Sequence, residues 1–173
     1  RMIPGMVLMA PADEEEMRRM IYNLYDIDDR PSAMRFPRGE VRGVRITDIR
    51  KGLEFGKGVI LKRGEDASII AAGAVVQIAE EAEKILDSRG VRATLANARF
   101  IKPLDMEMMD ECSRGGVPIY TVEENMLAGG FGDSVSEAVS NLGRNNYIKR
   151  MGINDLFVSH GTREELLADI DLT

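Results

Sequence analysis

The sequence predicts an α/β protein with a mostly parallel sheet and helices on both of its faces. Short apolar runs bounded by proline, glycine or charged residues alternate along the chain with segments whose apolar residues recur every three to four positions. Short turns separate these segments, so consecutive parallel strands are expected in one sheet with helices as crossovers. At 173 residues, with 44% hydrophobic and 30% charged residues, the chain is long enough for one packed domain and a remnant of another.

The chain begins with a predicted β-α-β unit. Residues 6–11 form an apolar run that ends in proline, as expected of a buried parallel strand. Asp13 and Glu16 then predict an acidic capping box at the start of a helix. The residues expected to face the core from this helix are Met17, Met20, Ile21 and Leu24. A second strand is predicted at residues 32–36, closed by the turn Pro37-Arg38-Gly39.

This first unit is incomplete as a fold. Two parallel strands and one helix leave a large apolar area in water, so residues 1–39 are expected to be the end of an earlier domain whose other strands are missing. Residues 40–58 carry scattered glycines and charges without periodicity and predict a linker that crosses a surface. Residues 59–173 are expected to form the second domain.

The second domain is predicted from a renewed alternation of strands and helices. Strands are expected at residues 59–62, 67–72, 92–97, 118–122 and 147–151. Helices are expected at residues 75–86, 104–112, 133–142 and 163–169. Gly90 is expected to end the first of these helices in a left-handed conformation, and Thr162 to cap the last.

Composition excludes several classes of function. A net charge of −6 without a Lys/Arg stripe argues against nucleic acid as a partner. No run approaches the roughly 18 apolar residues of a membrane span, and a signal peptide is not recognisable, so a cytoplasmic location is expected. The single cysteine, Cys112, fits a reducing compartment. The single histidine, His160, excludes His-rich metal sites and is expected in a loop before the last helix.

Arg38 is the residue most suited to binding a ligand. Pro37 stiffens its turn, Gly39 lets a ligand approach closely, and a guanidinium can hold a phosphate with two parallel hydrogen bonds. The turn follows the carboxyl end of a predicted parallel strand, where open α/β sheets bind ligands. From spacing alone, an exposed arginine or one paired with a surface carboxylate remains the alternative.

Two further segments have a structural and a functional interpretation. The acidic run from Asp13 to Glu16 is more simply explained by the dipole of a first helical turn than by a carboxylate site. The segment from Gly129 to Gly132 lies between a strand and a helix, where anions bind, but matches neither the dinucleotide nor the P-loop spacing. A structural turn at a domain or subunit interface is favoured there, with a ligand loop as the alternative.

Motifs along nearly the whole chain carry a family resemblance. They are Ile3-Pro-Gly, Ala10-Pro-Ala-Asp-Glu14, Met34-Arg-Phe-Pro-Arg-Gly39, Asn97-Ala-Arg-Phe-Ile-Lys-Pro-Leu-Asp105, Thr121-Val-Glu-Glu-Asn125 and Gly129-Gly-Phe-Gly132. In this order they resemble the 1-deoxy-D-xylulose-5-phosphate synthase family of the transketolase superfamily, over the end of its pyrimidine-binding domain and its C-terminal domain. A piece of a transketolase or of a 2-oxoacid dehydrogenase β subunit is one alternative, and a non-enzymatic interaction module is another.

The resemblance implies an activity for a longer parent protein. Enzymes of this family condense pyruvate with glyceraldehyde 3-phosphate and release CO2, using thiamine diphosphate and Mg²⁺, as the entry to non-mevalonate isoprenoid and to thiamine and pyridoxal precursors. The arginine of the family's Pro-Arg-Gly turn holds the sugar phosphate, and it corresponds to Arg38. Phe36 stands where the family more often has tyrosine.

The resemblance also implies what this chain does not supply. The family's Gly-Asp-Gly motif and downstream asparagine, its cofactor-activating glutamate and its active-site histidines all belong to segments before residue 1. No catalytic, cofactor-binding or metal-binding residue is therefore expected in this chain. It is expected to be inactive without the N-terminal and pyrimidine-binding domains of the same enzyme, which as a whole is expected to form a homodimer.

Overall fold

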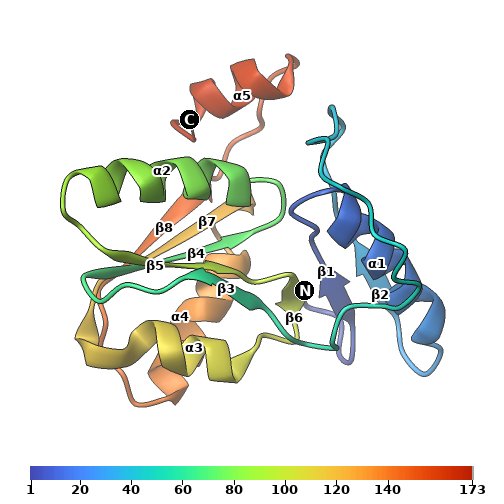
Figure 1. Cartoon of the computed structure of the whole chain (residues 1–173), viewed down its shortest axis with the longest axis horizontal. Coiled ribbons are helices and arrows are strands. Elements are labelled where there is room, and N and C mark those ends of the chain that lie inside the picture. Colours follow the sequence, from blue (N-terminus) through green and yellow to red (C-terminus); the bar gives the residue numbers. More distant parts are fainter. Residues whose placement is uncertain (173) are drawn as a thin grey trace.

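The computed structural model describes residues 1–172 and contains two β-sheets with their covering helices (Figure 1). In chain order the elements are β1 (Val7–Met9), α1 (Glu14–Asp26), β2 (Ser32–Met34), β3 (Val59–Lys62), β4 (Ala67–Ala72), α2 (Val76–Ser88), β5 (Ala93–Asn97), β6 (Phe100–Lys102), α3 (Met106–Ser113), a 3₁₀ turn (Arg114–Gly116), β7 (Ile119–Met126), α4 (Phe131–Asn141), β8 (Ile148–Ile153) and α5 (Arg163–Asp169).

The larger sheet forms the core of the second half of the chain. Its strand order is β3-β5-β4-β7-β8, and all neighbours are parallel except β3, which runs antiparallel to β5. In Figure 1, α2 and α5 lie on one side of this sheet, and α3 and α4 on the other. Buried β4 side chains alternate accordingly, with Ile70 packed toward α3 and α4, and Ile69 toward α2 and α5. The predicted fold class is confirmed.

The smaller sheet combines strands from both sides of the predicted domain boundary. Its order is β2-β1-β6, with β1 parallel to β2 and antiparallel to β6. The sequence did not predict β6, because three residues directly after β5 are too few to show a periodicity. Phe100 of β6 is fully buried with Met9, Met20 and Leu53. The first unit thus completes its small sheet with a strand from the second half of the chain.

Most predicted elements are present, but several of their boundaries differ by one or more residues. β3, β4 and α5 have the predicted limits, Gly90 has the expected positive φ of 81°, and Thr162 caps α5 within a complete capping box. β7 continues through Glu123 to Met126, beyond the predicted end at residue 122. α4 starts at Phe131, two residues earlier than predicted.

Helix α1 turns a partly polar face to the interior. Ile21, predicted in the core, is 51% exposed, and the buried positions are Glu16, Met20 and Asn23. The amide of Asn23 explains the difference, because it donates to the carbonyl of Leu53 and accepts from its N–H, both at 2.8 Å. The buried face of α1 therefore binds the segment around Leu53 as well as packing in the apolar core.

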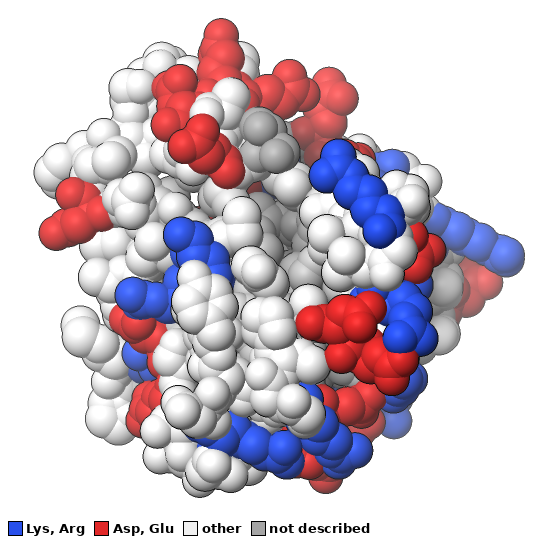
Figure 2. Space-filling view, turned by 90° about the vertical axis from the view of Figure 1, so that its left-hand side faces the viewer, with Lys and Arg blue, Asp and Glu red and all other residues white. Residues whose placement is uncertain are grey.

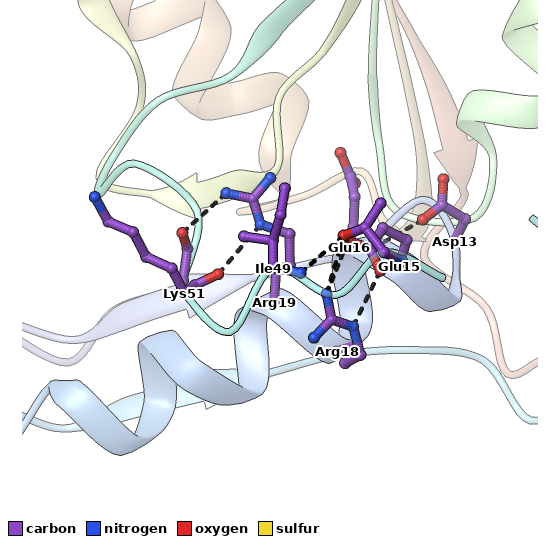
Figure 3. A network of polar contacts seen from close by, with 9 residues as sticks. Asp13, Glu15, Glu16, Arg18, Arg19, Ile49 and Lys51 are labelled. Carbon is purple, nitrogen blue, oxygen red and sulfur yellow. Dashed lines mark hydrogen bonds and ion pairs between the residues drawn. The ribbon is translucent and has the colours of Figure 1, made fainter. Parts of the chain in front are cut away.

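Residues 40–58 contain no helix or strand and run along α1. The Glu14 carboxylate accepts from the backbone N–H of Val44 at 2.7 Å, and Glu15 accepts from the hydroxyl of Thr47 at 2.6 Å. Arg19 donates to the carbonyls of Lys51 and Gly52 (Figure 3). The acidic first turn, predicted only to compensate the helix dipole, therefore also fastens the connection.

Replacing Glu15 by glutamine is expected to lower the stability of the fold at neutral pH and to make that stability less sensitive to acid. Hydrogen bonds from Arg18 and then Thr47 lower the pKa of Glu15 from 4.5 to about 2. A carboxyl whose pKa falls on folding stabilises the native state above its unfolded pKa, and this contribution is lost as the pH falls from about 4.5 toward 2. The stability difference between the parent chain and Glu15→Gln should shrink over that range in urea titrations at stepped pH.

The control for this experiment is Glu81→Gln, which changes an exposed glutamate on α2. That variant should follow the parent chain at every pH. A Glu15→Gln difference that stays constant from pH 6 to pH 2 would show that the charge of Glu15 does not stabilise the fold.

Charged side chains of both signs are mixed on the face shown in Figure 2. Asp and Glu gather at the upper edge of that face, while Lys and Arg are scattered around a central strip of uncharged residues. Within residues 1–172, no helix is both long enough and apolar enough to cross a membrane.

Candidate functional site

The carboxyl ends of β1 and β2 meet at one edge of the smaller sheet. The two strands pair in parallel, with Met9 opposite Met34, and the Arg35 N–H extends the pairing by donating to the Met9 carbonyl at 2.9 Å. The turn that carries Arg38 follows directly. The predicted location of Arg38, after the end of a parallel strand, is confirmed; its role in binding remains a prediction.

A cavity of about 330 Å³ adjoins Arg38 between the first unit and the start of α2. Its walls include Asp13, Glu14, Arg38, Arg42, Ala74 and Gln77. The Arg38 side chain is exposed, and among residues 1–172 no carboxylate pairs with it. A free guanidinium beside a cavity of this size can bind a small anionic ligand.

The other charged groups of this cavity are engaged, apart from the exposed Glu40, which also lines it and has no hydrogen bond or ion pair within residues 1–172. Arg42 forms an ion pair with Glu80 of α2. Asp13 accepts from the N–H of Glu16 at 2.8 Å and so caps α1. Burial raises the pKa of Asp13, as do the neighbouring charges of Glu16 and Glu14, whereas the hydrogen bond from Glu16 lowers it. Arg38 is thus the cation of the cavity that remains available to a ligand.

The start of α2 adds a second feature that favours anions. Its N-cap, Val75, makes no side-chain hydrogen bond to the first turn, and Ala74 and Gln77 face the cavity. The N–H groups of Val76 and Gln77 donate to the carbonyls of Gly73 and Ala74, so the helix dipole is what makes this end partly positive. Gly73 precedes this helix with a positive φ of 86°, a conformation that favours glycine.

A second polar network lies beside this cavity and ties α1 to β5. The Glu16 carboxylate accepts from Ala12 N–H at 3.0 Å, from the Asn97 amide at 3.0 and 3.1 Å, and from Arg99 Nε at 2.6 Å. Glu16 therefore does not complete the predicted capping box with Asp13. Asn97 and Arg99 are 81 and 83 residues away in sequence, so no local pattern shows these contacts. Arg99 adopts a left-handed φ of 57° there.

The start of α4 is occupied by the chain's own carboxylate. Glu123 is 1% exposed and accepts from the backbone N–H groups of Phe131 and Gly132, both at 2.7 Å. Burial raises the pKa of Glu123, while the hydrogen bonds from Gly132 and Phe131 lower it. The position where an external anion would bind is filled, which favours the structural interpretation of the Gly129–Gly132 segment. Its location at an interface stays a prediction.

The described residues do not form a fitting site for thiamine diphosphate and Mg²⁺. Within residues 1–172, no three His, Cys, Asp or Glu side chains are grouped to hold a metal ion. The glycine-rich helix start that would suit a diphosphate holds Glu123. Cys112 is buried in α3, and burial raises the pKa of its thiol to about 12, so it is not a ready nucleophile. His160 is exposed before α5.

Comparisons with known proteins agree with this architecture. Residues 56–173 match the family model described as "Transketolase, C-terminal domain". The 1-deoxy-D-xylulose-5-phosphate synthase of Heliobacterium modesticaldum is 42% identical over 173 residues, which are all of this chain and 27% of that protein. The synthase of Geobacillus thermodenitrificans is 43% identical, over all of this chain and 28% of its own length. The chain therefore spans about a quarter of the length of these relatives.

Solved structures give the same result for the fold. A structure titled "Split gene transketolase, inactive beta4 tetramer" superposes with a TM-score of 0.90 at 32% identity, over 100% of this chain and 55% of that one. A transketolase from Campylobacter jejuni gives 0.71 at 15% identity, over 98% of this chain and 25% of its own, a likeness of fold alone. With the family model matched over residues 56–173, the chain belongs to the transketolase C-terminal domain family.

Proposed function

We propose that this chain is the C-terminal part of a 1-deoxy-D-xylulose-5-phosphate synthase, in which Arg38 binds the phosphate of glyceraldehyde 3-phosphate. The proposal rests on Arg38, which has no carboxylate partner within residues 1–172. It lies beside a cavity of about 330 Å³, at the carboxyl ends of β1 and β2 and next to the start of α2. The relatives of that name, which match the chain along its whole length, support the proposal.

In the proposed enzyme, pyruvate condenses with glyceraldehyde 3-phosphate and CO2 is released, for isoprenoid precursor synthesis in the cytoplasm. Thiamine diphosphate with Mg²⁺ supplies the carbanion chemistry when bound, and its site lies in the N-terminal and pyrimidine-binding domains outside this chain. The contribution of this chain is to orient the acceptor: the Arg38 guanidinium donates two parallel hydrogen bonds to phosphate oxygens. In this homodimeric enzyme the pyrimidine-binding domain ends with residues 1–39. The linker is formed by residues 40–58, and the C-terminal domain by residues 59–173.

A second candidate is the corresponding part of a transketolase. The similarity to the split gene transketolase, at a TM-score of 0.90 and 32% identity, favours it. Both candidates use a phosphorylated acceptor, so the donor separates them: a synthase decarboxylates pyruvate, whereas a transketolase transfers a two-carbon unit from a ketose phosphate.

The test is a chimera in which this chain replaces the matching C-terminal segment of the Heliobacterium relative. The chimera should form 1-deoxy-D-xylulose 5-phosphate from pyruvate and glyceraldehyde 3-phosphate, measured by product chromatography and CO2 release. The parent relative and a version that ends where this chain would begin are the positive and negative controls. A folded chimera that forms no 1-deoxy-D-xylulose 5-phosphate would contradict the synthase proposal.

A further inference from the structure

Glu124 of β7 binds two arginines: Arg35, which precedes the Arg38 turn in sequence, and Arg163, at the start of α5. Its side chain is 11% exposed and forms an ion pair with Arg163, the first residue of α5. Its carbonyl oxygen accepts from Nη1 of Arg35 at 2.5 Å. Arg35 precedes Arg38 by three residues and is itself fixed to β1 through its backbone N–H. One residue of the larger sheet therefore contacts a residue of the Arg38 segment and a residue of the last helix.

Arg163 packs directly beside the turn. A Cβ on Gly39 would lie 3.9 Å from Cδ of Arg163, an ordinary van der Waals contact, so the aliphatic stem of Arg163 lies one residue from Arg38. Arg163 is not among the residues that line the 330 Å³ cavity. It lies next to the turn at Gly39 and outside the lining of the cavity.

The position of Arg163 depends on Glu124. Nε and Nη2 of Arg163 are buried and make no hydrogen bond of good geometry within the described chain, so the charge of Glu124 is their main compensation. α5 itself has other supports: Leu167 and Leu172 pack in the apolar cluster on β4 and α2, and Thr162 and Glu165 form its capping box. Removing the ion pair should therefore release the turn and leave α5 folded.

We propose that Glu124 and Arg163 are positioning residues for Arg38, which hold its turn against the larger sheet so that phosphate recognition depends on the docking of α5. This inference rests on the proposed function of Arg38. It gives the second glutamate of the Val-Glu-Glu motif a role, whereas the first, Glu123, caps α4.

The first experiment compares acceptors in the chimera with Arg163→Gln and with Glu124→Gln. Both variants should raise KM for glyceraldehyde 3-phosphate about fivefold, because a misplaced binding group loses its alignment with the phosphate. The KM for pyruvate, kcat, and activity with unphosphorylated glyceraldehyde should not change. Arg144→Gln is the matched control, since Arg144 is equally exposed at 31% and pairs with Asp110, away from the turn.

Equal acceptor discrimination in Arg163→Gln and Arg144→Gln would overturn the inference. Failure of the proposed function would give a different result. In that case Arg38→Met would leave the ratio of activity with phosphorylated and unphosphorylated acceptors unchanged. Hydrogen exchange of the 173-residue chain provides a second measurement that needs no activity. The amides of residues 38–40 should exchange faster in Arg163→Gln than in the parent chain or in Arg144→Gln, and unchanged exchange there would equally contradict the positioning role.

Discussion

Replacing Arg38 by methionine is expected to lower kcat/KM for glyceraldehyde 3-phosphate about 100-fold in the chimera. Two hydrogen bonds to a charged phosphate contribute about 1.5 kcal/mol each, and every 1.4 kcal/mol corresponds to a factor of ten. Methionine keeps much of the aliphatic volume while removing the charge and all donors. Because the side chain is exposed and has no carboxylate partner among residues 1–172, the fold should not be affected.

Discrimination between acceptors makes this prediction specific to phosphate. Activity with unphosphorylated glyceraldehyde and the KM for pyruvate should stay at parental values in Arg38→Met. The kcat/KM of Arg38→Lys for glyceraldehyde 3-phosphate should lie between those of the parent and Arg38→Met, because an ammonium retains the charge and loses the paired geometry. Arg45→Met, at an exposed arginine of the connection that does not line the cavity, is the control. A parental phosphorylated-to-unphosphorylated activity ratio in Arg38→Met would exclude Arg38 from the site.

The elements that the sequence predicted well are those specified by neighbouring residues. β4 lies at the predicted residues because its run of six buried side chains is bounded by charged residues and by Gly73. The start of α5 was predictable because Thr162 and Glu165 form a local capping box. The Arg38 turn belongs to the same class, since proline and glycine on either side of the arginine determine its shape.

The elements that the sequence did not predict depend on distant partners. β6 exists because it pairs with β1, more than 90 residues earlier in the chain, and its own three residues carry no strand pattern. Glu16 follows the rule for a capping residue, yet its carboxylate turns to Asn97 and Arg99. A buried carboxylate takes the strongest donors within reach, and the tertiary fold decides which donors those are.

The candidate site was therefore predictable in part. Sequence identified Arg38 and its position after a parallel strand, which the β1–β2 pairing confirms. It did not identify the opposite wall, formed by Ala74 and Gln77 at the start of α2, because helix α2 reaches the cavity only through the packing of the larger sheet against the first unit. Nor did it show that Asp13 and Glu14, near Arg38, accept hydrogen bonds from the backbone N–H groups of Glu16 and Val44.

Replacing Glu123 by alanine is expected to destabilise the 173-residue chain by about 3–5 kcal/mol. The substitution leaves two buried N–H groups unpaired, at a cost of about 1–3 kcal/mol each, and it opens a cavity in addition. Phe131 and Val135, on the same helix, are fully buried, so α4 cannot readily move to expose its first turn to water. The unfolding free energy from urea titration at neutral pH measures the loss.

Two further variants separate the capping role of Glu123 from a general effect of mutating α4. Glu137→Ala makes the same change at an exposed position of this helix and should stay within about 0.5 kcal/mol of the parent chain. Glu123→Gln keeps the shape and one acceptor oxygen, so it should lose less than Glu123→Ala and more than Glu137→Ala. A loss below about 1 kcal/mol in Glu123→Ala would mean that water reaches the freed N–H groups. The start of α4 would then be open to an external anion, and the ligand-loop interpretation of the Gly129–Gly132 segment would have to replace the structural one.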